Sequence, residues 1–171
     1  PGFRTYNYAT QAARSPGSTI KPLVVYSPAV AEGWSTNKEL DNSTTQYGSY
    51  EVNNYAGIQS SPTVPMYQAL AESLNLPAVA TANDLGLDTV FEYGKKFGAG
   101  VTTNPMQMAQ AYGTFANGGV MNDAHLITKI ENASGQVVKS HSQKSTRVLS
   151  GSTTDKMTNM MLGTFSNGTG V

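Results

Sequence analysis

The sequence predicts an α+β fold, and the order of its periodic segments carries that prediction. Apolar residues recur at helical spacing over most of the stretch 18–116. The spacing then becomes strand-like in 125–131 and 136–140, two runs joined by the turn-forming Asn132-Ala133-Ser134-Gly135. Because the helices come first and the hairpin follows, without alternating βα units, we expect an α+β arrangement and no parallel α/β sheet.

The first helix is expected over 18–31. Ser18 suits an N-cap or first-turn position, and the Pro-Gly pair before it marks a change of chain direction. Pro22 must fall in the first turn, where a missing N–H is tolerated. The aromatic and polar stretch 32–62 that follows is expected to be a long loop, which is typical of functional or poorly ordered segments.

Further helices are expected at 63–74, 75–85, 88–97, 104–116 and 152–165. Asn75-Leu76-Pro77 ends one helix and starts the next, and Asn104 followed by Pro105 reads as a cap with proline at the first helical position. The methionines of the last helix are interpreted as core residues: Met157, Met160 and Met161.

The composition excludes several kinds of function. Charged residues make up 13% of the chain and the formal net charge is +0, so we expect no nucleic-acid partner. The chain has no cysteine, which excludes disulfides, thiolate nucleophiles and cysteine-based metal sites. His125 is expected in a strand and His141 in a polar run, without metal-ligand spacing, so both are interpreted as structural or solvated. No metal or cofactor is expected.

One candidate nucleophile is Ser18, with Lys21 one helical turn away on the same face. Burial of Lys21 would disfavour its ammonium form, and a neutral amine could take the serine proton as a general base. The same spacing also occurs at Ser35 and Lys38, so the pattern alone does not select a site. Context favours Ser18, because an apolar helix follows it, whereas Ser35 lies in a polar loop beside Trp34.

The second candidate element is Ser73-Leu74-Asn75, which ends an amphipathic segment just before a proline. The Ser73 hydroxyl could relay protons to Lys21 or to a leaving amine, and the Asn75 amide could hold a substrate carbonyl. The alternative is a plain helix C-cap, a position where asparagine is common. Trp34 and the tyrosine-rich loop after it could likewise border a substrate groove or simply pack over the helices.

Taken together, these segments resemble the transpeptidase domain of class A penicillin-binding proteins. Arg14-Ser15-Pro16-Gly17-Ser18-Thr19-Ile20-Lys21-Pro22-Leu23 is similar to the first family signature, and Ala69 to Val79 is similar to the second. Residues 102–109 and Asn117-Gly118-Gly119-Val120 resemble the segments that follow, so the likeness runs through nearly the whole chain. The resemblance implies that Ser18 is acylated, that Lys21 is its base, and that Ser73 and Asn75 form the second motif.

The resemblance also implies a fold, a reaction and a location. The fold would be an antiparallel sheet flanked by helices, with a mostly helical subregion carrying both motifs. The reaction would be serine D,D-transpeptidation, in which peptidoglycan stem peptides ending in D-Ala-D-Ala are cross-linked and β-lactams inhibit. Stem peptides and β-lactams are the expected partners, and no cofactor is implied. The parent protein would also carry a glycosyltransferase domain and a membrane anchor, which would hold it on the outer face of the cytoplasmic membrane.

Two features depart from the family pattern. The third signature, Lys-Thr-Gly on a β-strand, is absent, and region 97–101 looks shorter than in relatives. We therefore expect residues 1–171 to be a transpeptidase domain that is incomplete at both ends and inactive alone, because the missing strand supplies an oxyanion-hole N–H. The alternatives are a non-catalytic cell-wall scaffolding module of the same fold, and a β-lactamase or β-lactam sensor.

Overall fold

The computed structural model describes residues 5–57 and 61–171. Its helical segments are, in chain order, α1 (Tyr8–Gln11), η1 (Gly17–Ile20), η2 (Pro22–Tyr26), α2 (Ser27–Ala31), η3 (Tyr55–Gly57), α3 (Met66–Ala71), α4 (Asn75–Leu85), α5 (Leu87–Lys96), α6 (Pro105–Ala116) and α7 (Gly151–Asn167). Its strands are β1 (Glu39–Asp41), β2 (Gln46–Tyr47), β3 (Tyr50–Glu51), β4 (Thr63–Pro65), β5 (Val120–Asn122), β6 (Lys129–Glu131), β7 (Val137–Ser140) and β8 (Ser145–Arg147). This mixture of helices and antiparallel strands confirms the α+β prediction. None of the described helices is both long and apolar enough to cross a bilayer.

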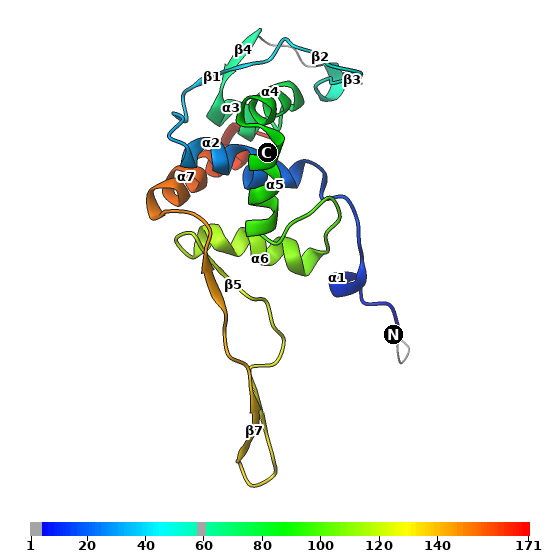
Figure 1. Cartoon of the computed structure of the whole chain (residues 1–171), viewed down its shortest axis with the longest axis vertical. Coiled ribbons are helices and arrows are strands. Elements are labelled where there is room, and N and C mark those ends of the chain that lie inside the picture. The colour runs from blue at the N-terminus through cyan, green and yellow to red at the C-terminus, as the bar shows by residue number, and fades with distance from the viewer. Residues whose placement is uncertain (1–4, 58–60) are drawn as a thin grey trace.

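The strands pair two by two, as β1 with β4, β2 with β3, β5 with β8 and β6 with β7. The first two pairs lie beyond one end of the helical body, and the other two form an arm that projects from its opposite end (Figure 1). The prediction of a helix from residue 63 was wrong at its start. Thr63–Pro65 pairs with Glu39–Asp41 as a strand, and the helix begins only at Met66. The β-branched Thr63 and Val64 favour that extended backbone.

The predicted helix over 18–31 is a continuous helical run, but three helix types follow one another in it. It begins as a 3₁₀ turn at Gly17–Ile20, widens to a π-helix at Pro22–Tyr26, and ends as α-helix at Ala31. In the π segment, both the N–H and the hydroxyl of Ser27 donate to the Pro22 carbonyl. Ser18 is a first-turn residue, because Pro16 occupies the N-cap position without a side-chain bond. Short π segments are often found at functional sites.

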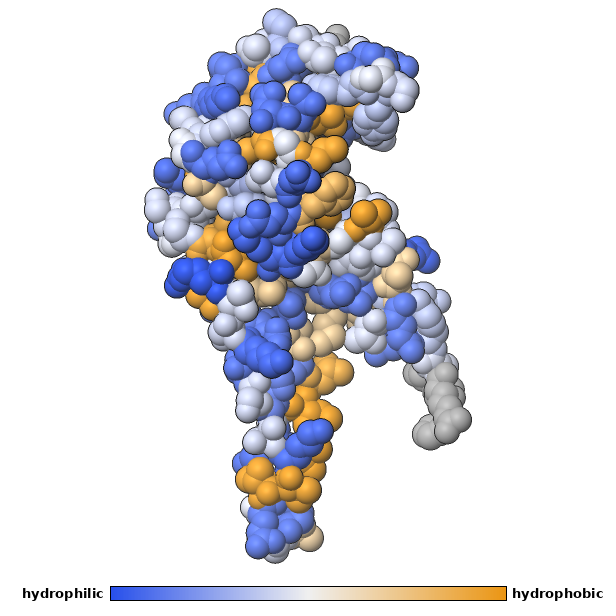
Figure 2. Space-filling model, viewed as in Figure 1, coloured by the Kyte–Doolittle hydropathy of each residue, from blue (hydrophilic) through white to orange (hydrophobic). Residues whose placement is uncertain are grey.

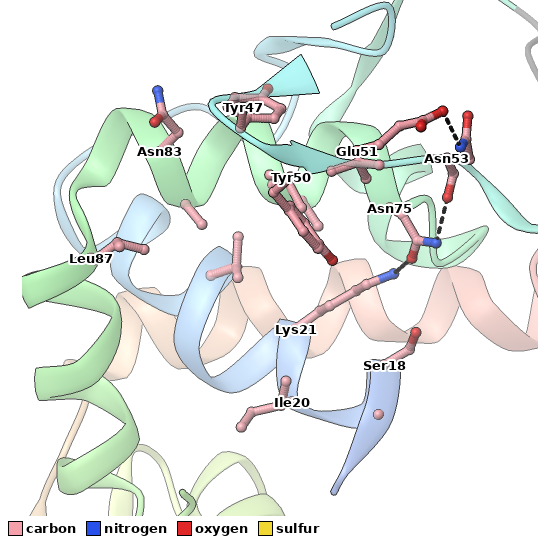
Figure 3. A pocket seen from close by; sticks show the side chains of 16 residues that line it. Ser18, Ile20, Lys21, Tyr47, Tyr50, Glu51, Asn53, Asn75, Asn83 and Leu87 are labelled. Atoms are coloured by element: carbon pink, nitrogen blue, oxygen red, sulfur yellow. Dashed lines mark hydrogen bonds between the residues drawn. The ribbon is translucent and has the colours of Figure 1, made fainter. Parts of the chain in front are cut away.

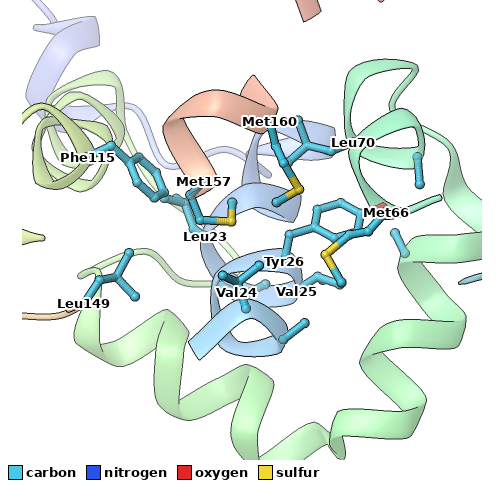
Figure 4. Packing of buried hydrophobic residues seen from close by; sticks show 14 of the residues in the cluster. Leu23, Val24, Val25, Tyr26, Met66, Leu70, Phe115, Leu149, Met157 and Met160 are labelled. Carbon is cyan, nitrogen blue, oxygen red and sulfur yellow. The ribbon is translucent and has the colours of Figure 1, made fainter. Parts of the chain in front are cut away.

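A buried apolar cluster encloses this first helical run on several sides (Figure 4). Leu23 and Tyr26 of η2 are fully buried, as are Met66 of α3 and Met157 of α7. Burying a leucine or methionine side chain stabilises the fold by about 1.5–3 kcal/mol. The core prediction for the methionines is confirmed: Met157 and Met160 are buried, and Met161 packs against the cluster. The helix that carries Ser18 and Lys21 is therefore held firmly by packing.

The projecting arm confirms the predicted hairpin and corrects its boundaries. Lys129–Glu131 pairs with Val137–Ser140, and a second pair, Val120–Asn122 with Ser145–Arg147, extends the arm toward the body. The sequence did not predict that second pair. His125 was expected in a strand, but it precedes β6, and its ring stacks on His141 with ring centroids 4.0 Å apart. Apolar side chains such as Leu126 and Val138 lie exposed along the arm, where Figure 2 shows an orange band.

Candidate active site

The Lys21 amine is surrounded by oxygen atoms of the second motif. Its Nζ lies 2.7 Å from the Ser73 carbonyl and 2.7 Å from Asn75 Oδ1, and a little farther from the Leu74 carbonyl (3.2 Å) and Ser73 Oγ (3.4 Å). The structure thus brings Lys21, Ser73 and Asn75 together although 52 residues separate Lys21 from Ser73 in the sequence. Partial burial removes solvation from the ammonium, which lowers the pKa of Lys21 to about 8.

These partners can hold the amine in either protonation state. The three carbonyl-type oxygens can only accept hydrogen bonds, so they match the three donors of the ammonium form, and after loss of a proton two N–H groups still satisfy the two nearest of them. The remaining lone pair then needs a donor, and the Ser73 hydroxyl is the one group among these four contacts that can give a proton. A lone pair directed at a hydroxyl is the arrangement that proton transfer between an amine and a serine requires.

The Asn75 side chain is fixed in one orientation by its two neighbours. Its Nδ2 donates to the Asn53 carbonyl at 2.8 Å, so its Oδ1 faces Lys21. Asn75 is also the first residue of α4, not the C-cap of the helix before it, so the C-cap alternative was wrong. The prediction that α4 ends at Leu85, before Gly86, is confirmed.

Ser73 adopts a backbone conformation that normally favours glycine. Its φ is +54°, and two hydrogen bonds close the end of α3: Ser73 N–H to the Leu70 carbonyl and Leu74 N–H to the Ala69 carbonyl. This is a Schellman motif with Ser73 at the left-handed position, where glycine is the usual residue. A left-handed conformation costs an L-residue about 1–2 kcal/mol, so serine stands here at the expense of stability. Strain of this kind concentrates at functional sites.

A pair of buried asparagines holds the start of α4, and sequence reasoning missed it. Asn54 Oδ1 accepts from the N–H groups of Asn75 (2.8 Å) and Leu76 (3.0 Å), so it caps α4 from a distant loop. Asn54 Nδ2 donates to Asn42 Oδ1 at 2.8 Å, and Asn42 in turn donates to the Ser61 carbonyl. Asn42 and Asn54 are only 1% and 6% exposed, which ties this loop firmly to the second motif.

Ser18 lies exposed in the 3₁₀ turn, with Lys21 following on the same helical run (Figure 3). The turn is anchored by Tyr112 of α6, whose hydroxyl donates to the Thr19 carbonyl at 2.7 Å. Burial raises the pKa of Tyr112 to about 12, so it stays a donor at neutral pH. No hydrogen bond joins Ser18 Oγ to any residue that the structure describes, so no described partner fixes the orientation of its hydroxyl.

Two hollows meet at Ser18 and Lys21. The larger, of about 790 Å³, runs between the first helix, α4 and the loop of β2 and β3, and its lining includes Asn53 and Asn75. The smaller, of about 470 Å³, is lined by Ser73, Tyr112 and residues of α7. Tyr47 and Tyr50 line the larger groove, which supports the groove interpretation for the tyrosine-rich loop. Trp34 instead packs against the core.

The second S-x-x-K pair forms no such site. Ser35 Oγ accepts from the Asn37 N–H within its own turn, and Lys38 Nζ lies 3.4 Å above the Trp34 ring. Ser35 and Lys38 are both exposed. The described part of the chain also holds no group of three or more His, Asp or Glu side chains arranged to bind a metal ion.

Comparison with known sequences identifies relatives along nearly the whole chain. The sequence model of the penicillin binding protein transpeptidase domain matches residues 2–104 and 96–171. Penicillin-binding protein 2a of Streptococcus pneumoniae is 63% identical over 185 positions, covering 99% of this chain and 25% of the relative. Penicillin-binding protein 1A/1B of Bacillus subtilis is 31% identical, covering 96% of this chain and 20% of that protein. The chain thus spans a quarter or less of these relatives.

The sequence alignments also bear on region 97–101. The alignment with the S. pneumoniae protein is longer than this chain, and the family match is divided in two around 96–104. The divided family match places an interruption at this region, whereas the alignment length gives no position for its gaps.

Two solved structures share the fold of this chain. Penicillin-binding protein A from M. tuberculosis, solved as an imipenem acyl-enzyme complex, superposes with a TM-score of 0.86 at 21% identity, covering 94% of this chain and 46% of that one. The D,D-transpeptidase domain of a peptidoglycan glycosyltransferase from Eggerthella lenta gives 0.87 at 19% identity, covering 96% and 52%. At these identities the likeness shows a common fold.

Proposed function

Because the chain belongs to the penicillin-binding protein transpeptidase family, we propose that it carries the nucleophilic half of a serine D,D-transpeptidase that cross-links peptidoglycan. The substrate would be a stem peptide ending in D-Ala-D-Ala. Ser18 would be the nucleophile and Lys21 its general base, with Ser73 and Asn75 arranging the proton transfers. β-Lactams would acylate the same serine.

The enclosure of the Lys21 amine is the observation that carries this proposal. A lysine with a pKa of about 8 has a substantial neutral fraction near neutral pH, which an ordinary surface lysine lacks. The amine and Ser18 line the same groove, and the oxygens of Ser73, Leu74 and Asn75 hold the amine in place. Covalent catalysis by serine requires a nucleophile and an oriented base that face the same substrate site, and Ser18 and Lys21 meet that requirement by lining one groove.

In the acylation step, the neutral amine of Lys21 takes the proton of the Ser18 hydroxyl as Oγ bonds to the carbonyl carbon of the penultimate D-alanine. The carbonyl oxygen becomes an oxyanion. The Ser18 N–H belongs to the first helical turn, where backbone donors have no intrahelical acceptor, and it can stabilise that oxyanion. Such a donor contributes roughly a hundred- to a thousandfold to the rate.

Collapse of this intermediate breaks the peptide bond and expels the terminal D-alanine. Its amine needs a proton, which Lys21 returns through the Ser73 hydroxyl, 3.4 Å from Nζ. The acyl group stays on Ser18 as an ester. The amine of a neighbouring stem peptide then attacks that ester, loses its proton along the same route, and regenerates the free serine.

The wider role of the gene product is part of the same proposal. We place it in cell-wall synthesis on the outer side of the cytoplasmic membrane, in a protein that also carries a peptidoglycan glycosyltransferase. Two facts support this: the chain covers only 25% and 20% of the S. pneumoniae and B. subtilis relatives, and the Eggerthella lenta domain belongs to a peptidoglycan glycosyltransferase. The chain contains no Lys-Thr-Gly triplet, and that part of the site would come from elsewhere in the gene product.

The test is intact-mass spectrometry of the full-length gene product after incubation with benzylpenicillin. The wild type and a Ser35→Ala variant should each gain one penicilloyl group, and Ser18→Ala should gain none. The Ser35→Ala variant is the matched control, because it removes the same hydroxyl from the second S-x-x-K pair. Circular dichroism establishes that each variant is folded.

Other outcomes would point to the alternatives. No adduct on a folded wild-type protein would favour a non-catalytic cell-wall scaffold. An adduct that disappears within seconds, with rapid turnover of a chromogenic cephalosporin, would favour a β-lactamase. An adduct on Ser18→Ala but not on Ser35→Ala would reverse the assignment of the nucleophile.

A further inference from the structure

The helix that begins with Asn75 has no side-chain cap of its own. Leu74 occupies the N-cap position of α4, and its apolar side chain offers no acceptor to the N–H groups of the first turn. Pro77, the third residue of the helix, has no N–H to satisfy. The two N–H groups that precede it, those of Asn75 and Leu76, therefore need an acceptor from another part of the chain.

Asn54 supplies that acceptor from the loop that follows β3. Its Oδ1 accepts from both N–H groups, at 2.8 Å from Asn75 N and 3.0 Å from Leu76 N. The orientation of its amide is fixed, because Asn54 Nδ2 donates to Asn42 Oδ1 at 2.8 Å. Asn42 is fixed in turn by donating to the Ser61 carbonyl. Both asparagines are buried, and hydrogen bonds in such a place of low dielectric are strong.

The segment around Asn54 holds Asn75 at two points. The side chain of Asn54 binds the backbone N–H of Asn75, and the carbonyl of the preceding residue, Asn53, accepts from Asn75 Nδ2 at 2.8 Å. Two adjacent residues thus set both the start of α4 and the orientation that turns Asn75 Oδ1 toward Lys21 (Figure 3). The carbonyls of the two residues before this helix start accept from the same amine.

Asn54 itself does not border the space in which a ligand would react. It is not among the described residues that line either hollow, whereas its neighbour Asn53 lines the larger one. A ligand bonded to Ser18 would therefore meet the effect of Asn54 only through Asn75 and the other acceptors around Lys21. Asn54 can act on the reaction by placing other groups, without touching the reacting atoms.

We propose that Asn54 is a positioning residue for the reaction, which holds the oxygens of the second motif around the Lys21 amine and so keeps the base at its place in the groove. The inference rests on the proposed function, because it assigns a further residue to that site. The amide oxygen of Asn54 is the part that acts, and its loss lets the start of α4 shift relative to Lys21. A side chain that keeps an oxygen there should keep most of the rate.

The test measures the rate constant of benzylpenicillin acylation in the full-length gene product, extrapolated to high pH, where the amine is neutral in every variant. Asn54→Ala should lower this rate constant about ten- to a hundredfold, because a small misplacement of a catalytic group is enough for such a loss. Asn54→Asp gives up the bond to Asn42 but keeps an acceptor for both N–H groups, and it should stay within about threefold of the wild type.

Ser150→Ala is the matched control. It removes the side-chain cap at the start of α7, where Ser150 Oγ accepts from the Thr153 N–H at 3.1 Å. Neither residue lines a hollow that contains Ser18. The control therefore loses a helix cap away from the base, and its acylation rate constant should be unchanged.

The final amount of adduct separates positioning from a merely structural role. A substitution that only destabilises the fold lowers that amount but leaves the rate constant of the folded molecules as it was. If Asn54→Ala does not fold, Asn54→Ser, whose hydroxyl ends one bond short of the Asn54 oxygen, takes its place with the same expected loss. A wild-type rate constant in either folded variant would overturn the inference, as would a tenfold or greater loss in Asn54→Asp. No adduct on the wild type would instead overturn the proposed function.

Discussion

The chain holds two serine–lysine pairs with the same spacing, and their surroundings differ in almost every respect. Lys21 lies among oxygens of a helix start 52 residues away, in a half-buried place that lowers its pKa to about 8. Lys38 lies on the exposed face of the Trp34 ring. Ser18 opens onto two hollows, whereas Ser35 accepts a hydrogen bond in its own turn. The same spacing therefore gives a lysine with a lowered pKa only where a second segment encloses the amine.

The strongest test of this comparison is the removal of each lysine in turn. Lys21→Ala should slow benzylpenicillin acylation about a hundred- to ten-thousandfold, the contribution that general bases typically make. Lys38→Ala should change the rate less than twofold, because that amine touches no group of the site. Stopped-flow or quenched mass-spectrometric measurement of the acylation rate decides the matter, and equal effects at both positions would contradict the comparison.

The two serine–lysine pairs can also be compared by placing a negative charge near the lysine of each pair. Asn75→Asp puts a carboxylate against the Lys21 amine, where an opposite charge raises the lysine pKa by roughly one to three units. A higher pKa leaves less neutral amine, so acylation at pH 7 should fall at least tenfold and recover as the pH is raised. Asn37→Asp places the same charge between Ser35 and Lys38 and should leave the rate unchanged. A pH profile that does not move in Asn75→Asp would argue against Lys21 as the base.

The wild-type pH profile follows from the lowered pKa of Lys21. Only the neutral amine can accept the serine proton, so the acylation rate should rise with pH with a midpoint at about pH 8. With a pKa of about 8, the neutral fraction grows from about one-tenth at pH 7 to about nine-tenths at pH 9, a tenfold gain. The Lys38→Ala variant should show the same midpoint. A rate independent of pH between 7 and 9 would mean that another group takes the proton.

The sequence was informative wherever a local signal decided the structure. The helix at 75–85 was predicted because asparagine and proline mark its start and Gly86 follows its end. The helix after Asn104 was predicted from its cap, which the structure shows as a capping box with Gln107. Ser18 and Lys21 were singled out by spacing and by the apolar helix that follows them.

Features built from distant segments escaped the sequence reasoning. The strand at Thr63–Pro65 exists because Glu39–Asp41 pairs with it, and local periodicity carries no trace of that partner. Asn42 and Asn54 look like ordinary loop residues until folding places them against the start of α4. The left-handed backbone of Ser73 was also hidden, because serine at that position gives no sign of a turn that normally takes glycine.

The backbone conformation of Ser73 gives the prediction with the smallest expected effect, a difference in stability and not in rate. At Ser73 the φ of +54° suits glycine and strains alanine, so Ser73→Gly should be more stable than Ser73→Ala by about 1 kcal/mol. Both variants keep the carbonyl that binds Lys21, and both lose the hydroxyl. Urea denaturation of the full-length gene product, monitored by circular dichroism, gives the free energies of unfolding.

The same pair of substitutions at Ser35 should give the opposite order. Among the described residues other than glycine, only Ala56 and Ser73 have a positive φ, so Ser35 lies in ordinary backbone. There, glycine adds freedom to the unfolded chain, and Ser35→Ala should be more stable than Ser35→Gly by roughly 0.4–1 kcal/mol. If glycine and alanine rank alike at both positions, the strain at Ser73 is not a property of the folded protein. The reversed order would show that the segment around the Ser18–Lys21 site differs from the Ser35–Lys38 segment in its backbone as well as in its environment.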